Sequence, residues 1–122
     1  MNKKKAPHSG RVWVGFDLGG TKMLAKIFND DYETLGRAKQ KTLGAKGAKT
    51  GLSRMASLIG KALDAAGVSP DQIAGIGVGC PGPIDAEKGE IVEAPNLGWS
   101  DVPVRAHLQE TFERPTVMCN DV

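Results

Sequence analysis

The feature that most constrains this chain is a glycine-containing turn between two apolar runs near the N-terminus. Residues 12–16 and 23–28 are rich in β-branched, aromatic and aliphatic side chains, which predicts two strands. The sequence Asp-Leu-Gly-Gly-Thr-Lys at residues 17–22 separates them. Because a Gly-Gly pair suits a tight hairpin, we expect the two strands to pair antiparallel.

The next part of the chain extends this hairpin into an α/β arrangement. Residues 34–42 form a weaker, more polar strand that completes an N-terminal three-stranded antiparallel meander, and residues 43–51 are expected to be a loop. Apolar residues recur at helical spacing from Leu52 to Ala66, which predicts a helix. Residues 73–79 form a buried strand, and the helix before it indicates that it runs parallel to the first strand.

The second half completes a mixed sheet. A hairpin tip is expected at residues 87–90, a helix at residues 104–112 and a short strand at residues 115–119. The expected fold class is therefore α/β, with the meander, a mixed sheet and at least two helices. Because parallel sheets place ligand groups at the carboxyl ends of their strands, a chain that stops there is expected to be the N-terminal part of a longer protein.

Composition and charge narrow the function classes. A length of 122 residues suits one domain, and 40% hydrophobic with 25% charged residues is ordinary for a soluble protein. The net charge of +2 is too small to indicate a nucleic acid partner, and we expect residues 1–11 to be a disordered basic tail. No apolar run approaches the roughly 20 residues of a membrane span, and the Lys-rich start does not lead into a signal peptide. A cytoplasmic protein without a membrane partner is therefore expected.

The two cysteines match no metal-ligand spacing. Cys80 and Cys119 are far apart in the sequence, and the absence of an export signal favours free thiols over a disulfide. We expect each to behave as a buried, small apolar residue rather than a nucleophile.

The turn between the first two strands carries more functional groups than a turn requires. Gly19 and Gly20 permit positive φ and close approach of the backbone to a phosphate. Thr21 adds a hydroxyl, Lys22 adds a positive charge, and Asp17 is an oxygen ligand suited to hydrated Mg²⁺. A plain hairpin turn explains the glycines alone, so a structural turn and a phosphate site both remain open from these residues.

Two other glycine-containing stretches fail as nucleotide loops. Residues 77–82 fit G-x-G-x-x-G after a strand, but Pro83 follows and no helix opens there, as a dinucleotide site requires. Residues 44–50 end in Lys-Thr, yet Leu43 and Ala48 stand where the phosphate-loop pattern requires glycine. Neither stretch is therefore expected to hold a nucleotide.

Four blocks in register resemble the ROK family (repressors, open reading frames, kinases) of the sugar kinase/actin/Hsp70 ATPase superfamily. They are "DLGGTK" at residues 17–22, "IGVGCPGPID" at 76–85, "GEIVEAPNLGWSDVP" at 89–103 and "CNDV" at 119–122. The resemblance covers residues 12–122 and is greatest to ROK glucokinases. It implies a ribonuclease H-like (actin-like ATPase) domain, the N-terminal domain of a ROK-type kinase.

This resemblance also implies a chemistry: transfer of the γ-phosphate of Mg·ATP to a hexose hydroxyl, as in glycolysis. Asp17 would lie near the Mg²⁺, through water, and the phosphates would be bound by Gly19, Gly20, Thr21 and Lys22. The sugar would be bound by Gly82, Asn96, Asn120 and Asp121, and Asp121 would also be the catalytic base. Amides suit a sugar because they both donate and accept hydrogen bonds, and phosphoryl transfer relies on a carboxylate that aligns the nucleophile.

The resemblance leaves several points open. Cys119 stands where related kinases often have an acid, and the family's adenosine pocket, further sugar ligands and frequent structural zinc site belong to a C-terminal half beyond these residues. The 122-residue chain alone is therefore expected to fold marginally and to be inactive, whereas the full-length protein is expected to be a homodimer.

Three functions compete. The first is a glucokinase-like enzyme, and the second is a kinase for another sugar, such as N-acetylmannosamine, N-acetylglucosamine, fructose or allose, with ATP or polyphosphate as donor. The third is a sugar-sensing ROK repressor, which is disfavoured because only about ten residues precede the first strand, too few for a helix-turn-helix module.

Overall fold

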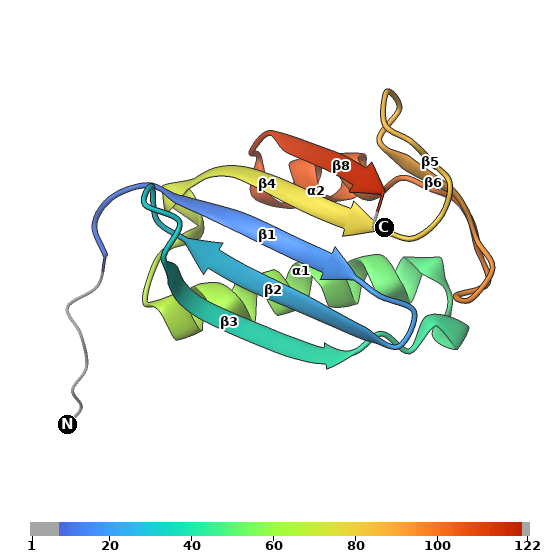
Figure 1. Cartoon of the computed structure of the whole chain (residues 1–122), viewed down its shortest axis with the longest axis horizontal. Coiled ribbons are helices and arrows are strands. Elements are labelled where there is room, and N and C mark those ends of the chain that lie inside the picture. The colour runs from blue at the N-terminus through green and yellow to red at the C-terminus, as the bar shows by residue number, and fades with distance from the viewer. Residues whose placement is uncertain (1–7, 121–122) are drawn as a thin grey trace.

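A computed structural model describes residues 8–120, and residues 1–7, 121 and 122 lie outside the described part. The described chain forms one five-stranded mixed sheet in the order β3-β2-β1-β4-β8 (Figure 1). The strands of this sheet are β1 (Val12–Leu18), β2 (Lys22–Phe28), β3 (Thr34–Lys41), β4 (Ile73–Cys80) and β8 (Thr116–Asn120). β1 to β3 are antiparallel, and β4 runs parallel to both β1 and β8, so the predicted meander and mixed sheet are confirmed.

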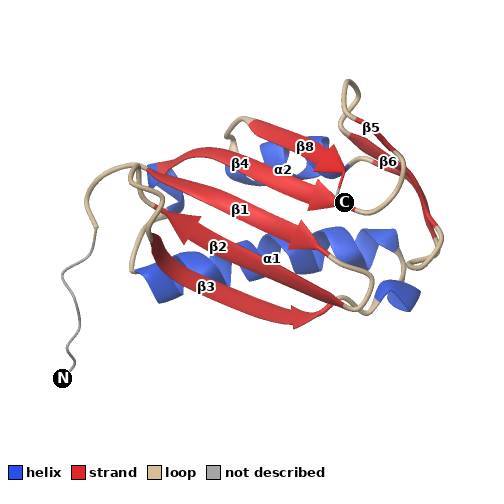
Figure 2. Ribbon diagram, in the orientation of Figure 1, coloured by secondary structure: helices blue, strands red, loops and turns tan. Residues whose placement is uncertain are grey.

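Two helices pack against the same face of the sheet, as Figure 2 shows. They are α1 (Ala48–Ala66) and α2 (Val104–Phe112), and short 3-10 turns lie at η1 (Gly44–Lys46) and η2 (Pro70–Gln72). Alternate residues of β1 are buried beneath α1, and α1 contributes a stripe that includes Met55, Ile59 and Leu63. This core follows from the period of two in the strand and the helical period in α1. Within the described residues, no helix is long and apolar enough to cross a membrane.

A second, smaller sheet follows β4. It contains β5 (Ile84–Asp85), β6 (Glu90–Ala94) and β7 (Trp99–Val102), paired antiparallel in that order. The hairpin between β5 and β6 was predicted, but β7 was not. Its sequence Trp-Ser-Asp-Val buries only its two ends, and Asp101 has a positive φ of 53°, so it lacks the alternation that identifies a strand.

The loop predicted for residues 43–51 is wrong over most of its length. η1 occupies Gly44–Lys46, and α1 begins at Ala48 rather than Leu52. The residue before α1 is Gly47, which makes no side-chain capping bond, so the usual signal for a helix start is missing. Tertiary contacts therefore determine where this helix begins.

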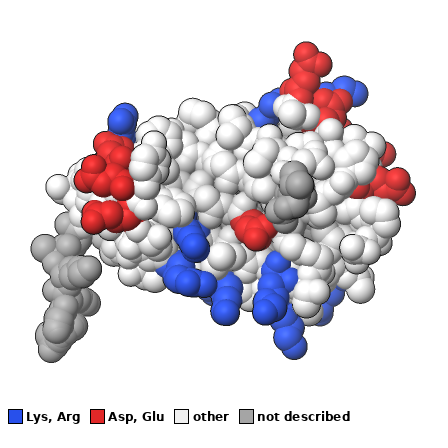
Figure 3. Space-filling view, viewed as in Figure 1, with Lys and Arg blue, Asp and Glu red and all other residues white. Residues whose placement is uncertain are grey.

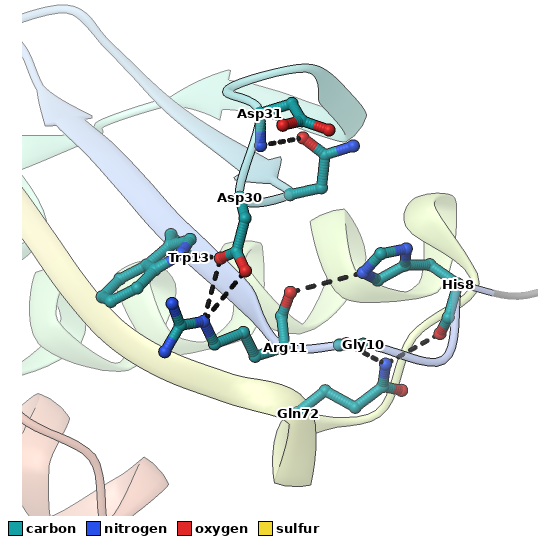
Figure 4. Close-up of polar contacts among 8 residues, drawn as sticks. His8, Gly10, Arg11, Trp13, Asp30, Asp31 and Gln72 are labelled. Carbon is teal, nitrogen blue, oxygen red and sulfur yellow. Dashed lines mark hydrogen bonds and ion pairs between the residues drawn. The ribbon is translucent and has the colours of Figure 1, made fainter.

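The last residues of the stretch expected to be a disordered tail are held by hydrogen bonds (Figure 4). The Gln72 side-chain amide donates to the carbonyls of His8 and Gly10, at 2.8 Å each. Arg11 donates to both carboxylate oxygens of Asp30 at 2.9 and 3.1 Å, and Trp13 Nε1 donates to Asp30 at 2.9 Å. The expected disorder therefore does not extend to residues 8–11, and residues 1–7 lie outside the described part.

The two cysteines occupy opposite faces of the sheet. Cys80 is buried and Cys119 is exposed, and both are free thiols. Cys119 pairs with Gly79, one residue before Cys80, and successive strand residues point to opposite faces. Free thiols were predicted correctly, but the expectation that Cys119 is buried is wrong.

Replacement of Gly36, in β3, tests the packing of α1 on the sheet. A methyl group on its Cα would lie 2.5 Å from the backbone nitrogen of Ala66, at the end of α1. We expect Gly36→Ala to lower the free energy of unfolding by about 1–3 kcal/mol, because the helix backbone has to move. The matched control is Gly60→Ala, in the middle of α1 with open space around it, which should raise stability by about 0.5–1 kcal/mol. Urea unfolding followed by circular dichroism compares the two variants. A change in the free energy of unfolding with the same sign in both would contradict this packing.

Replacement of Asp30 tests how the start of β1 is anchored. Hydrogen bonds from Trp13 and Arg11 lower the pKa of the Asp30 carboxyl below its usual value. Because the folded pKa is the lower one, the stabilisation is present above the unfolded pKa of about 3.9 and is lost as the pH falls through the folded pKa. Asp30→Asn should therefore reduce the thermal midpoint near neutral pH, and this difference should disappear in acid. Asp31→Asn, one residue further on, is the control and should leave the pH dependence unchanged.

Candidate phosphate and sugar site

The turn predicted to bind phosphate is a tight hairpin between β1 and β2. Leu18 pairs with Met23, and Gly19 N–H donates to the Lys22 carbonyl at 2.9 Å, which leaves Gly20 and Thr21 at the tip. Neither glycine has a positive φ, so the expectation that they supply left-handed backbone is wrong. At Gly19, glycine is instead required because the turn leaves no room for a side chain.

Gly19 and Gly20 lack side chains for different reasons. A methyl group on Gly19 would lie 2.7 Å from the carbonyl oxygen of Lys22, within the turn itself. On Gly20 it would lie 3.6 Å from Cβ of Asn96, a residue of the β6–β7 loop. Gly19 therefore closes the turn, and Gly20 brings the turn against the loop that was predicted to bind sugar.

The N–H groups at the tip point to anion binding. In the part of the chain that the structure describes, the N–H groups of Gly20 and Thr21 donate to no other backbone group. Thr21 and Lys22 are exposed. The hairpin thus presents N–H donors, a hydroxyl and an ammonium group together, the chemistry that a phosphate chain requires.

The carboxyl ends of β1, β4 and β8 meet at the same edge of the sheet as the hairpin (Figure 1). In register across the sheet, Asp17 pairs with Gly79, and Gly79 pairs with Cys119. Asn120 pairs with Cys80, one residue further toward this edge. Asn120 therefore lies about two strand spacings, roughly 10 Å, from the end of β1, and Asp121 lies outside the described residues.

Gly82 lies where the chain passes from the large sheet to the small one. It has a φ of 142°, outside the range that most side chains accept, and a methyl group on it would lie 3.3 Å from the Glu93 carbonyl. The next residue, Pro83, accepts a hydrogen bond from Val92 N–H at 2.9 Å. Gly82 is therefore held against β6, two residues after the Cys80–Asn120 pair.

Asn96 lies in the loop between β6 and β7, which is anchored beneath by Trp99. The Trp99 side chain is only 2% exposed, and its Nε1 donates to the Gly44 carbonyl at 3.1 Å. The N–H groups of Leu97 and Gly98 both donate to the Ala94 carbonyl at 2.9 Å, which forms the turn. The prediction that Trp99 packs rather than stacks on a sugar is confirmed, and the Asn96 side chain is left exposed.

Positive charge gathers beside the hairpin. Lys22 pairs with Lys41, and Lys26 pairs with Arg37, so these side chains point to the face of the sheet that no described helix covers. Figure 3 shows Lys and Arg along the lower part of this face, over β2 and β3. Such a row raises the local concentration of a polyanion. Lys41 escaped notice in the sequence because its place beside Lys22 depends on the strand register.

Asp17 points to the same uncovered face. Its side chain is exposed, and it lines a hollow of about 380 Å³ with Gly79 and Cys119. Among residues 8–120, no group of three or more His, Cys, Asp and Glu side chains could by itself hold a metal ion. A single carboxylate suits Mg²⁺ that keeps most of its waters and binds mainly to substrate phosphates, so Asp17 fits that ion.

Comparison with known proteins agrees with this geometry. Residues 13–122 match the ROK family. A glucokinase from Halalkalibacterium halodurans is 31% identical over 113 residues, 93% of this chain and 34% of the glucokinase. A xylose repressor from Caldicellulosiruptor bescii is 31% identical over 117 residues, 88% of this chain and 27% of the repressor. The structure is similar to that of a ROK hexokinase from Thermus thermophilus, with a TM-score of 0.78 and 34% identity over 89% of this chain and 35% of the hexokinase.

The strand order and these structural similarities define a domain of the actin-like ATPase, or ribonuclease H-like, class. The chain belongs to the ROK family. It spans about a third of the length of the glucokinase and the hexokinase that it matches.

Proposed function

We propose that the protein carrying this chain is an ATP-dependent hexose kinase that phosphorylates a glucose-like sugar. The observation that carries this proposal is the meeting of two loops: a methyl group on Gly20, in the hairpin, would lie within 3.6 Å of Asn96 in the β6–β7 loop. A donor site for phosphate and an amide suited to sugar hydroxyls are therefore adjacent, as direct phosphoryl transfer requires. The identity to a glucokinase and a hexokinase supports the substrate class.

The proposed roles follow the positions at the edge of the sheet. The hairpin binds the phosphates through Gly19, Gly20, Thr21 and Lys22, and Asp17 would hold a hydrated Mg²⁺, which would neutralise phosphate charge. Gly82, Asn96 and Asn120 orient the sugar. Asp121 follows Asn120 directly, and we assign it as the base that accepts the proton of the attacking hydroxyl.

Other parts of the proposal rest on the family resemblance alone. They are a cytoplasmic location, a homodimeric full-length protein, the identity of the metal as Mg²⁺ and ATP rather than polyphosphate as donor. A coupled assay on the complete protein, with a panel of sugars and both donors, tests the substrate and donor together. Absence of sugar-dependent ADP formation with every sugar would overturn the proposed kinase.

A ROK repressor is the second candidate, because the xylose repressor matches at the same identity as the glucokinase. The described residues contain the proposed sugar contacts Gly82, Asn96 and Asn120 in either case. Sugar-dependent release of the complete protein from DNA, without ADP formation, would favour the repressor.

Asp121 provides the sharpest test of the kinase reaction. We expect Asp121→Asn in the complete protein to reduce kcat by about 10²- to 10⁴-fold, because the amide cannot accept the hydroxyl proton. The dissociation constant for the sugar, measured by titration calorimetry, should change little because the amide still hydrogen-bonds. A kcat within twofold of the original would show that Asp121 is not the base.

The two glycines of the hairpin form a matched pair. Gly19→Ala places a methyl group 2.7 Å from a backbone carbonyl and should raise the KM for ATP by at least tenfold, because the turn has to open. Gly20→Ala makes only an ordinary contact with Asn96, so its effect on the KM for ATP should be smaller. Steady-state kinetics at saturating sugar compares them, and the reverse order would contradict the turn geometry.

A further inference from the structure

Thr42 lies behind the hairpin and is bonded to it twice. It follows β3 directly and is fully buried, at 0% exposure. Its hydroxyl donates to the Gly19 carbonyl at 2.8 Å, and its N–H donates to the Thr21 carbonyl at 2.7 Å. Among the described residues, only Thr42 and Thr116 are polar and buried in this way. The hydroxyl and the N–H of Thr42 thus both bond to one turn.

The bond to Gly19 determines the direction of a neighbouring donor. The Gly19 carbonyl and the Gly20 N–H belong to the same peptide unit, which is planar and trans. The Thr42 hydroxyl holds the Gly19 carbonyl oxygen on the side of the hairpin that faces Thr42. The Gly20 N–H therefore has to point to the side away from Thr42. The hydroxyl therefore aims a phosphate-binding donor without touching phosphate itself.

The chain that follows Thr42 reaches the other loop at Gly44. Leu43 has a left-handed backbone, with φ 54° and ψ 49°, and turns the chain toward Gly44. The Gly44 carbonyl accepts from Trp99 Nε1, and a methyl group on Gly44 would lie 2.7 Å from the Leu97 side chain. Residues 42–44 therefore link the hairpin, which Thr42 contacts, to the loop that carries Asn96, which Gly44 contacts.

We propose that Thr42 is a positioning residue for phosphoryl transfer: its hydroxyl aims the Gly20 N–H at the phosphate chain and fixes the hairpin relative to the sugar loop. This inference rests on the proposed kinase function and adds a residue to it. A loss of the hydroxyl leaves the core intact but frees the Gly19–Gly20 peptide to rotate. Nucleotide binding should suffer, whereas sugar binding through Asn96 and Asn120 should not.

The test compares two buried threonines in the complete protein. Thr42→Val keeps the shape of the side chain and removes the donor, and should raise the KM for ATP and weaken binding of Mg·AMPPNP by between about 2-fold and about 13-fold, the range expected from one hydrogen bond. The control, Thr116→Val, also removes a buried hydroxyl that donates to a carbonyl, that of Arg114, but near the start of β8. It should leave both values unchanged. Neither variant should change the KM for the sugar by more than twofold.

Thr42→Ser completes the comparison, because it restores the donor and should recover binding of Mg·AMPPNP measured by titration calorimetry. If Thr42→Val does not fold, Thr42→Cys, with a weaker donor of similar size, takes its place. Equal effects of Thr42→Ser and Thr42→Val, or an unchanged nucleotide affinity in Thr42→Val, would overturn the role of the hydroxyl while leaving the kinase intact. An unsubstituted protein that binds no nucleotide and phosphorylates no sugar would overturn the kinase and, with it, this inference.

Discussion

The parallel pairing of β4 with β1 on one side and with β8 on the other is the constraint on which the site depends. Parallel strands end at the same edge of a sheet, and an element that crosses between them has to lie on a face. Both crossovers, through α1 and through α2, lie on one face, and the strand ends and the hairpin lie together at one edge of the sheet (Figure 2). Backbone register places Asp17 and Asn120 at this same edge of the sheet, about two strand spacings apart.

The face of the sheet that the helices do not cover carries fewer side chains, because three residues of β4 that point to it are glycines. Rings of Trp13 and Phe28 lie over Gly75 and Gly15, whereas Gly77 has open space above it. Val117, on the same face, is 68% exposed. Full burial of such a side chain contributes about 1.5–3 kcal/mol, which the described residues do not gain. The exposed Val117 therefore contributes less to the stability of this chain than a buried valine would.

The sequence allowed the meander, the hairpin, α1, α2 and the strand ends to be predicted, because their apolar periods and turn residues are local signals. The start of α1 was missed because Gly47 carries no capping group, and β7 was missed because Asp101 interrupts its pattern. In the site, the backbone conformation of Gly19 and Gly20 was misjudged, because neither has a positive φ. A Gly-Gly pair indicates either positive φ or close approach, and only the contacts to Lys22 and Asn96 decide between them. Thr42 escaped notice because an edge threonine is common, and only the fold brings its hydroxyl to Gly19.

The two halves of the site are supported by different kinds of interaction. The hairpin and Asn120 are part of the main sheet and are held by its backbone ladder. Asn96 lies in the β6–β7 loop of the small sheet. Side chains help to hold this sheet, because Trp99 bonds to Gly44 before α1 and the Arg105 guanidinium of α2 donates to the carbonyls of Ala86 and Glu87. One backbone bond, from Arg105 N–H to the Gly89 carbonyl, adds to them. A backbone ladder changes little when side chains are replaced, whereas side-chain anchors can be repacked. On the proposed assignment of Asn96 to the sugar, substitutions in the small sheet can therefore alter this contact while the hairpin between β1 and β2 keeps its geometry.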